Sequence, residues 1–92
     1  MTDERVTRVL DGLRYDTDKA TLVAQRFSDR WLHLYQTDKG RYFIVDYLRG
    51  EEPDVRAVSE DAAFAMCSDD AFPWDMVVDW EEAFPDRDFE DA

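Results

Sequence analysis

The sequence predicts a small single α+β domain: a three- or four-stranded antiparallel sheet with a central β-hairpin, and two or three short helices. The chain has 92 residues, which suits one small domain. Its hydrophobic content of 45% and aromatic content of 14% exceed those of a disordered chain. Two aromatic and β-branched runs flank a turn at residues 38–40, as in a β-hairpin. We expect residues 1–85 to form the domain and residues 86–92 to form a flexible acidic tail.

The first quarter of the chain predicts a strand and then a helix. Residues 4–10 alternate in the manner of a strand and end at the turn Asp11-Gly12. Thr17 is expected to cap a helix that follows, because threonine oxygens accept bonds from the first free amides of a helix. Apolar residues then recur at i, i+3, i+4 and i+7, the spacing of one helix face. They are Ala20, Val23, Ala24 and Phe27.

The clearest predicted element is a hairpin over residues 30–48, in which Gly40 supplies a positive φ at the turn. Neither face of this hairpin is properly polar. One face should pack on helices, and the other needs a cover from the C-terminal segment or from a partner. The second face presents aromatic side chains that a homodimer or another protein could use. They are Trp31, Tyr35, Phe43 and Tyr47.

The second half predicts a short extended piece at Val55–Val58 and a helix capped by Ser59. Residues 69–85 predict an acidic amphipathic C-terminal helix. Pro73 suits its first position and Pro85 would end it.

Little in the sequence indicates catalysis. The one histidine, His33, lies between leucines in a strand, and the one cysteine, Cys67, excludes an internal disulfide and a multi-cysteine zinc site. Each of the three glycines has a turn role, so no phosphate-binding loop is present. Asp86, Asp88 and Glu90 alternate, but they lack the central glycine of a calcium loop. We therefore expect no enzyme activity, no catalytic residue, no cofactor and no metal.

The net charge of −12 is concentrated at the end of the chain. Residues 69–92 hold ten acids and one arginine, for −9, while residues 1–68 hold thirteen acids and ten bases, for −3. Such a field repels nucleic acid and attracts basic surfaces. The first residues contain no apolar run of signal-peptide or membrane length, so a cytoplasmic location is expected.

Twelve residues between positions 12 and 66 follow a recurring pattern of a Tyr-Asp-Thr start, a Leu-Tyr-x-Thr-x-x-Gly-x-Tyr-Phe hairpin and a Ser-initiated helix. They are Tyr15, Asp16, Thr17, Ala20, Leu34, Tyr35, Thr37, Gly40, Tyr42, Phe43, Ser59 and Ala62. In this pattern the chain resembles small proteins of phages and bacterial mobile elements, to which no general activity is assigned. It departs from the pattern at Ile44, where leucine is usual, and at Asp61-Ala62, where Glu-Ala is usual. The resemblance implies a fold and a context in which small proteins disarm host defence.

One hypothesis for the acidic end is DNA mimicry. Asp75, Asp79, Glu82 and Asp86 lie at i, i+4, i+7 and i+11 of the predicted C-terminal helix and would form an acidic stripe on one face. Carboxylates at i and i+4 on a helix lie about 6 Å apart, close to the phosphate repeat of a nucleic-acid strand. The protein would then be an anti-CRISPR or anti-restriction inhibitor that occupies the basic DNA- or RNA-binding surface of a host-defence protein. Eight residues are the candidate binding site: Asp69, Asp70, Trp74, Asp75, Asp79, Glu82, Asp86 and Asp88.

Other readings stay open. The acids of the last quarter could be only the solvated face of a packed helix. Salt adaptation would suit two lysines against nine arginines and sixteen aspartates against seven glutamates, but it should acidify the whole surface. A third alternative is an accessory module of a mobile element that binds a protein without mimicking DNA.

Overall fold

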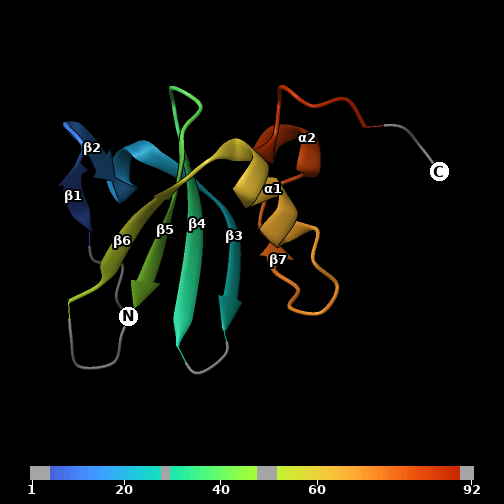
Figure 1. Ribbon diagram of the computed structural model, residues 1–92, viewed down its shortest axis with the longest axis horizontal. Helices are drawn as coiled ribbons and strands as arrows, with labels where there is room; N and C mark the ends of the chain where they lie inside the picture. The colour runs from blue at the N-terminus through green and yellow to red at the C-terminus, as the bar shows by residue number, and fades with distance from the viewer. Residues whose placement is uncertain (1–4, 28–29, 48–51, 90–92) are drawn as a thin grey trace.

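A computed structural model of the chain describes residues 5–27, 30–47 and 52–89. It is an α+β fold in which five antiparallel strands form one sheet, in the order β6-β5-β4-β3-β7, and two more form a separate hairpin, β1–β2. The hairpin and the two α-helices lie toward opposite ends of the long axis (Figure 1). The elements are β1 (Thr7–Leu10), β2 (Leu13–Asp16), η1 (Thr17–Lys19), β3 (Ala20–Phe27), β4 (Trp31–Thr37), β5 (Tyr42–Tyr47), β6 (Asp54–Val58), α1 (Glu60–Cys67), β7 (Asp75–Met76) and α2 (Trp80–Ala83).

The central hairpin is confirmed as β4 and β5. Gly40 has φ of 83°, which it adopts without a Cβ penalty, and its amide donates to the carbonyl of Thr37 at 3.0 Å. The two strands pair antiparallel over six positions, from Trp31 opposite Tyr47 to Gln36 opposite Tyr42. Both faces of β4 and β5 contribute to a core cluster, Leu34 and Tyr42 to one and Phe43 and Val45 to the other, which explains why neither face is polar.

The predicted helix after Thr17 is wrong. Asp16 caps a single 3-10 turn by accepting from the amide of Asp18, and the residues from Ala20 onward form strand β3. The register shifts between Leu22 and Ala24, so Val23 occupies a β-bulge. Because of the bulge, the adjacent residues Val23 and Ala24 both lie in the same core cluster. Apolar residues in this strand therefore do not alternate strictly, and their spacing resembles that of a helix face.

The predicted helix over residues 69–85 is also wrong. The segment forms the two-residue strand β7 and the one-turn helix α2 instead. β7 pairs with the edge of β3, and the Val77 amide donates to the Val23 carbonyl at 2.9 Å. This pairing satisfies backbone groups of β3 that would otherwise lack partners. These two corrections explain why the sheet has more strands than the three or four predicted.

The helix predicted after Ser59 is confirmed as α1. The Ser59 hydroxyl accepts from the amide of Ala62 at 3.0 Å, and Glu60 and Asp61 occupy the first turn. Carboxylates there suit the positive end of the helix dipole. The extended piece at 55–58 is confirmed within β6.

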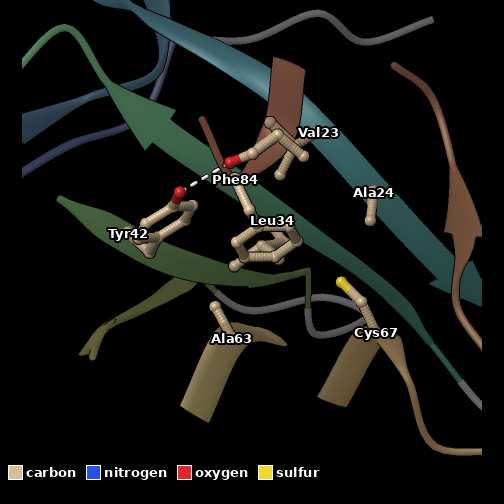
Figure 2. Close-up of a cluster of buried hydrophobic side chains, with 8 residues drawn as sticks. Val23, Ala24, Leu34, Tyr42, Ala63, Cys67 and Phe84 are labelled. Carbon is tan, nitrogen blue, oxygen red and sulfur yellow. Dashed lines mark hydrogen bonds between the residues drawn. The ribbon is translucent and has the colours of Figure 1, made fainter. Parts of the chain in front are cut away.

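One face of the sheet is covered by the two helices and the residues that follow β7. The core here is one cluster of buried side chains from β3, β4, β5, α1, α2 and Phe84, most of them drawn in Figure 2. Phe84 is fully buried and stacks on Tyr42, with ring centroids 5.4 Å apart. The Tyr42 hydroxyl donates to the buried carbonyl of Ala83 at 2.5 Å. The C-terminal segment is therefore tied to the sheet by aromatic packing and by one buried hydrogen bond.

The opposite face is covered by the N-terminal hairpin. Val6 and Tyr15 pack with Phe43, Val45 and Val55. From the sequence we expected the C-terminal segment or a partner to cover this face. For the part of the face around Phe43 that prediction is wrong, because Val6 and Tyr15 cover it. Residues of the hairpin are near this face in space because β2 runs directly through η1 into β3.

The hairpin leaves part of this face open. Trp31 is 47% exposed and Phe27 is 60% exposed, and their rings lie 4.9 Å apart. Of the four aromatic residues predicted for a dimer surface, Phe43 is buried and Tyr35 and Tyr47 are half-buried. The homodimer stays a prediction. Within the described parts of the chain, no helix is long and apolar enough to cross a membrane.

Candidate functional site

The candidate site is an acidic C-terminal surface made of eight carboxylates. They are Asp69, Asp70, Asp75, Asp79, Glu81, Glu82, Asp86 and Asp88. All eight residues are exposed. Across residues 5–27, 30–47 and 52–89, none of the eight forms an ion pair. Of the eight carboxylates, that of Asp69 alone accepts a hydrogen bond from a described residue, the Ala71 amide at 2.9 Å.

Acids in the earlier part of the chain behave differently. Seven carboxylates before residue 62 make ion pairs with arginines: Asp16, Asp18, Asp46, Glu52, Asp54, Glu60 and Asp61. Two of them, Asp16 and Asp46, are buried. The two regions therefore differ in how their acids are used, as well as in how many they contain.

The one base of the C-terminal segment, Arg87, points away from the acids beside it in sequence. Its Nε lies 3.5 Å from a Glu60 oxygen, and a second guanidinium nitrogen binds Asp61. The guanidinium also lies over the Phe64 ring, 4.2 Å from its centroid. Arg87 thus anchors residues 84–89 to α1 and leaves Asp86 and Asp88 without a counter-charge. Phe89 adds to this anchor, since its ring centroid lies 6.1 Å from that of Phe64; residues 90–92 of the predicted flexible tail lie outside the described residues.

The acidic residues do not form the predicted helical stripe. Asp75 lies on β7 opposite Gln25, Asp79 is the N-cap of α2, and Glu82 lies within α2. A four-residue helix cannot hold the i, i+4, i+7 and i+11 spacing that the stripe required, and Asp86 follows α2 rather than extending it. The mimicry geometry expected from a single helix is therefore overturned. What remains is an acidic surface built from a loop, an edge strand and one helical turn.

Trp74 has a structural position in the site. Its side chain is half-buried and packs against the helix-side core, as does that of Trp80. The more exposed aromatic ring nearby is Phe72, 58% exposed, which the sequence prediction missed. Arg26 lies 5.0 Å from the centroid of the Phe72 ring and donates to the Phe72 carbonyl at 3.2 Å.

The two side chains best suited to proton or nucleophile chemistry are in unfavourable surroundings. Burial raises the pKa of the Cys67 thiol to about 11, so the reactive thiolate is scarce at neutral pH. Burial lowers the pKa of His33, whose Nδ1 is buried without a hydrogen-bond partner and whose ring lies 5.0 Å from that of Tyr47. No group of three His, Cys, Asp or Glu residues in the described ranges could hold a metal ion.

A second charged feature is absent from the sequence prediction. Arg14, Lys19, Lys39 and Arg41 line one cleft between the N-terminal hairpin and the β4–β5 turn. The four residues come from segments separated by about twenty positions, so no local pattern connects them. The sequence offers only a partial signal, because Lys39 lies in the predicted hairpin turn whereas Lys19 falls in the segment predicted to be helical.

The fold and its two charged regions define a small α+β protein with an unpaired acidic surface and a separate basic cleft. Comparison with protein-family models, with curated proteins and with solved structures finds no match to this chain.

Proposed function

We propose that this protein is a non-catalytic binding module that recognises a basic surface of a partner protein through its acidic C-terminal surface. The observation that carries the proposal is the difference in pairing: eight exposed carboxylates after residue 68 have no ion-pair partner among the described residues, whereas seven earlier carboxylates have one. Unpaired surface carboxylates add to a long-range negative potential, which accelerates encounter with a basic partner and disfavours acidic ones.

The partner we favour is a nucleic-acid-binding protein of host defence, such as a CRISPR or restriction effector. Such proteins hold phosphates with lysine and arginine side chains, and carboxylates can occupy the same positions. Two features support this choice: the local charge of −9 in residues 69–92 and the resemblance to phage and mobile-element proteins. The protein would act as an inhibitor in the host cytoplasm. Competition with nucleic acid here requires only a dense acidic surface and does not depend on a helical stripe.

The proposal is tested with two variants of equal charge. One neutralises the acidic C-terminal surface with Asp75→Asn, Asp79→Asn and Glu82→Gln. The matched control neutralises three exposed acids elsewhere, with Asp11→Asn, Glu52→Gln and Asp54→Asn. Both variants change the net charge from −12 to −9, so a difference between them reports position rather than total charge.

The measurement is affinity capture from a lysate of the host, with the captured proteins identified by mass spectrometry. We expect the wild type and the control to retain one nucleic-acid-binding protein and the acidic-surface variant to lose it. Duplex DNA should displace the partner, and added salt should weaken the complex, because exposed charges are screened over about 8 Å at 0.15 M salt. Equal capture by all three proteins would contradict the role of the acidic surface. Capture that DNA cannot displace would contradict competition with nucleic acid and favour another kind of accessory module.

A further inference from the structure

The basic cleft lies between residues 12–16, Lys19 and residues 37–41, and has a volume of about 390 Å³. Four cationic side chains line it: Arg14, Lys19, Lys39 and Arg41. In Figure 1 the β1–β2 hairpin lies at the left of the sheet and the β4–β5 turn at its top.

These four cations differ from the other described lysine and arginine residues in their lack of an ion pair with a described carboxylate or a hydrogen bond like that of Arg26. Ten lysine and arginine residues lie within the described ranges. Five of them form ion pairs: Arg5, Arg8, Arg30, Arg56 and Arg87. Arg26 bonds to the Phe72 carbonyl. The remaining four form no ion pair with a described residue, and all of them line the same cleft. Four cations that form no ion pair within the described residues and that gather on one hollow surface indicate a site for an external anion.

Two aspartates also line the cleft, and they offset only part of its positive charge; Lys19 is one of the groups that lower the pKa of Asp16. Asp16 is buried and is bound by Arg5, whose Nε donates to Oδ1 at 3.1 Å, and by the Asp18 amide at 3.0 Å. These contacts hold the pKa of Asp16 below its ordinary value. Asp38 is exposed at the tip of the turn. The lining contains four bases and two acids, so its net charge is +2. Arg5, which is outside the lining, further compensates the charge of Asp16.

Local hydrogen bonds hold the backbone in the cleft and beside it. In the lining, the Thr37 hydroxyl accepts from the Arg41 amide at 3.0 Å. Next to the lining residue Asp16, the Thr17 hydroxyl accepts from the Val6 amide at 3.0 Å, and the Thr17 amide donates to the Val6 carbonyl at 3.0 Å. A site whose backbone is already held loses less entropy when a ligand binds.

We propose that this cleft binds a small phosphate-bearing anion. Lysine and arginine are the side chains that bind phosphate, lysine as a point charge and arginine through paired donors. The cleft has the size of a small-molecule pocket, which typically measures about 300–1,000 Å³. A long nucleic acid is disfavoured, because most of its phosphates would lie outside the cleft and be repelled by a molecule with a net charge of −12.

The test is calorimetric titration of the full chain with inorganic pyrophosphate, with amide chemical shifts followed in parallel. The decisive variant is Arg41→Gln, and the matched control is Arg56→Gln, which removes an exposed arginine of β6 outside the cleft. We expect pyrophosphate to shift the amides of Gly12 and Lys39. Losing one charged donor should weaken binding about tenfold in Arg41→Gln, while Arg56→Gln stays within about twofold of wild type.

Titrations with other phosphate-bearing ligands identify which kind of ligand the cleft prefers. AMP, ADP and a twelve-nucleotide single-stranded DNA are titrated under the same conditions, and Lys39→Gln, in the exposed turn, provides a second cleft variant should Arg41→Gln fail to fold. Tighter binding of the oligonucleotide than of every small anion would overturn the choice of a small ligand. Absence of pyrophosphate binding, or equal weakening by Arg56→Gln and a cleft variant, would overturn the site. The acidic-surface variant should bind pyrophosphate as well as wild type does, so this result is independent of the proposed function.

Discussion

The N-terminal hairpin and the C-terminal segment each cover one face of the sheet, but their acidic side chains differ: one is buried in an ion pair, and the others are exposed and unpaired among the described residues. The N-terminal hairpin places Val6 and Tyr15 on one face, and the C-terminal segment places Phe84 on the other. In the hairpin an ion pair between Arg5 and the buried carboxylate of Asp16 accompanies the apolar contacts. In the C-terminal segment the eight acids stay exposed and unpaired among the described residues, and the segment is held by aromatic packing, by pairing of β7 with β3 and by Arg87.

The difference separates charge that supports the fold from charge that is available for binding. A buried carboxylate must keep its partner, because leaving it unpaired is strongly unfavourable. An exposed carboxylate without a partner contributes little to stability and can change without unfolding the protein. We therefore expect the acidic C-terminal surface to tolerate neutralisation and the hairpin ion pair to resist it.

The largest expected effect is loss of the aromatic anchor of the C-terminal segment. Phe84→Ala removes a fully buried ring that packs on Tyr42, Phe64 and Trp80, and should lower the free energy of unfolding by about 3–5 kcal/mol. Phe72→Ala, in the same segment but 58% exposed, is the control and should change it by less than about 0.5 kcal/mol. Urea unfolding measures both. Equal losses would show that the segment is not anchored through Phe84.

The next effect concerns pH and the hairpin ion pair. Arg5 lowers the pKa of Asp16 from its ordinary value of 3.8, so the folded state favours the ionised carboxylate. The stabilisation is fully present above the unfolded pKa of about 3.9 and is lost as the pH falls through the lower folded value. The advantage of wild type over Asp16→Asn in urea midpoint should therefore be constant from pH 7 to 5 and should shrink below pH 4. If the advantage of wild type stayed constant down to pH 2, ionisation of Asp16 would not stabilise the fold.

The smallest effect is expected from the acidic C-terminal surface itself. The variant with Asp75→Asn, Asp79→Asn and Glu82→Gln removes no ion pair and no side-chain cap bond, so its free energy of unfolding should stay within about 0.5 kcal/mol of wild type. Thermal unfolding at 0.05 and 1 M KCl checks this. A loss above about 1 kcal/mol would mean that these acids support the fold after all. A large gain in stability of the wild type in 1 M KCl would favour salt adaptation.

Local signals in the sequence predicted two elements well. The β4–β5 hairpin follows from Gly40 between two β-branched and aromatic runs, and α1 follows from the Ser59 cap with acids in its first turn. Both depend on residues within a few positions of one another, whose preferences act in any context. Of the eight acids in the candidate site, the sequence prediction named seven and missed Glu81, and it misassigned the backbone of the segment and the packing of Trp74.

Two segments could not be assigned locally, because their conformation depends on partners elsewhere in the chain. The bulge at Val23 gives β3 an apolar spacing that matches a helix, and only pairing with β4 resolves the ambiguity. Asp75 and Met76 become a strand because the free edge of β3 lies beside them.

By itself, the sequence determined the α+β class, the central hairpin, helix α1 and the concentration of negative charge after residue 68. The tertiary structure alone decided which acids find a counter-charge, that Arg87 turns toward α1, and that four cations meet in one cleft. The physical reason is distance along the chain. The pairing of β7 with β3, the contacts of Arg87 with α1 and the cleft all join residues about twenty or more positions apart, and composition and periodicity carry no information about such contacts.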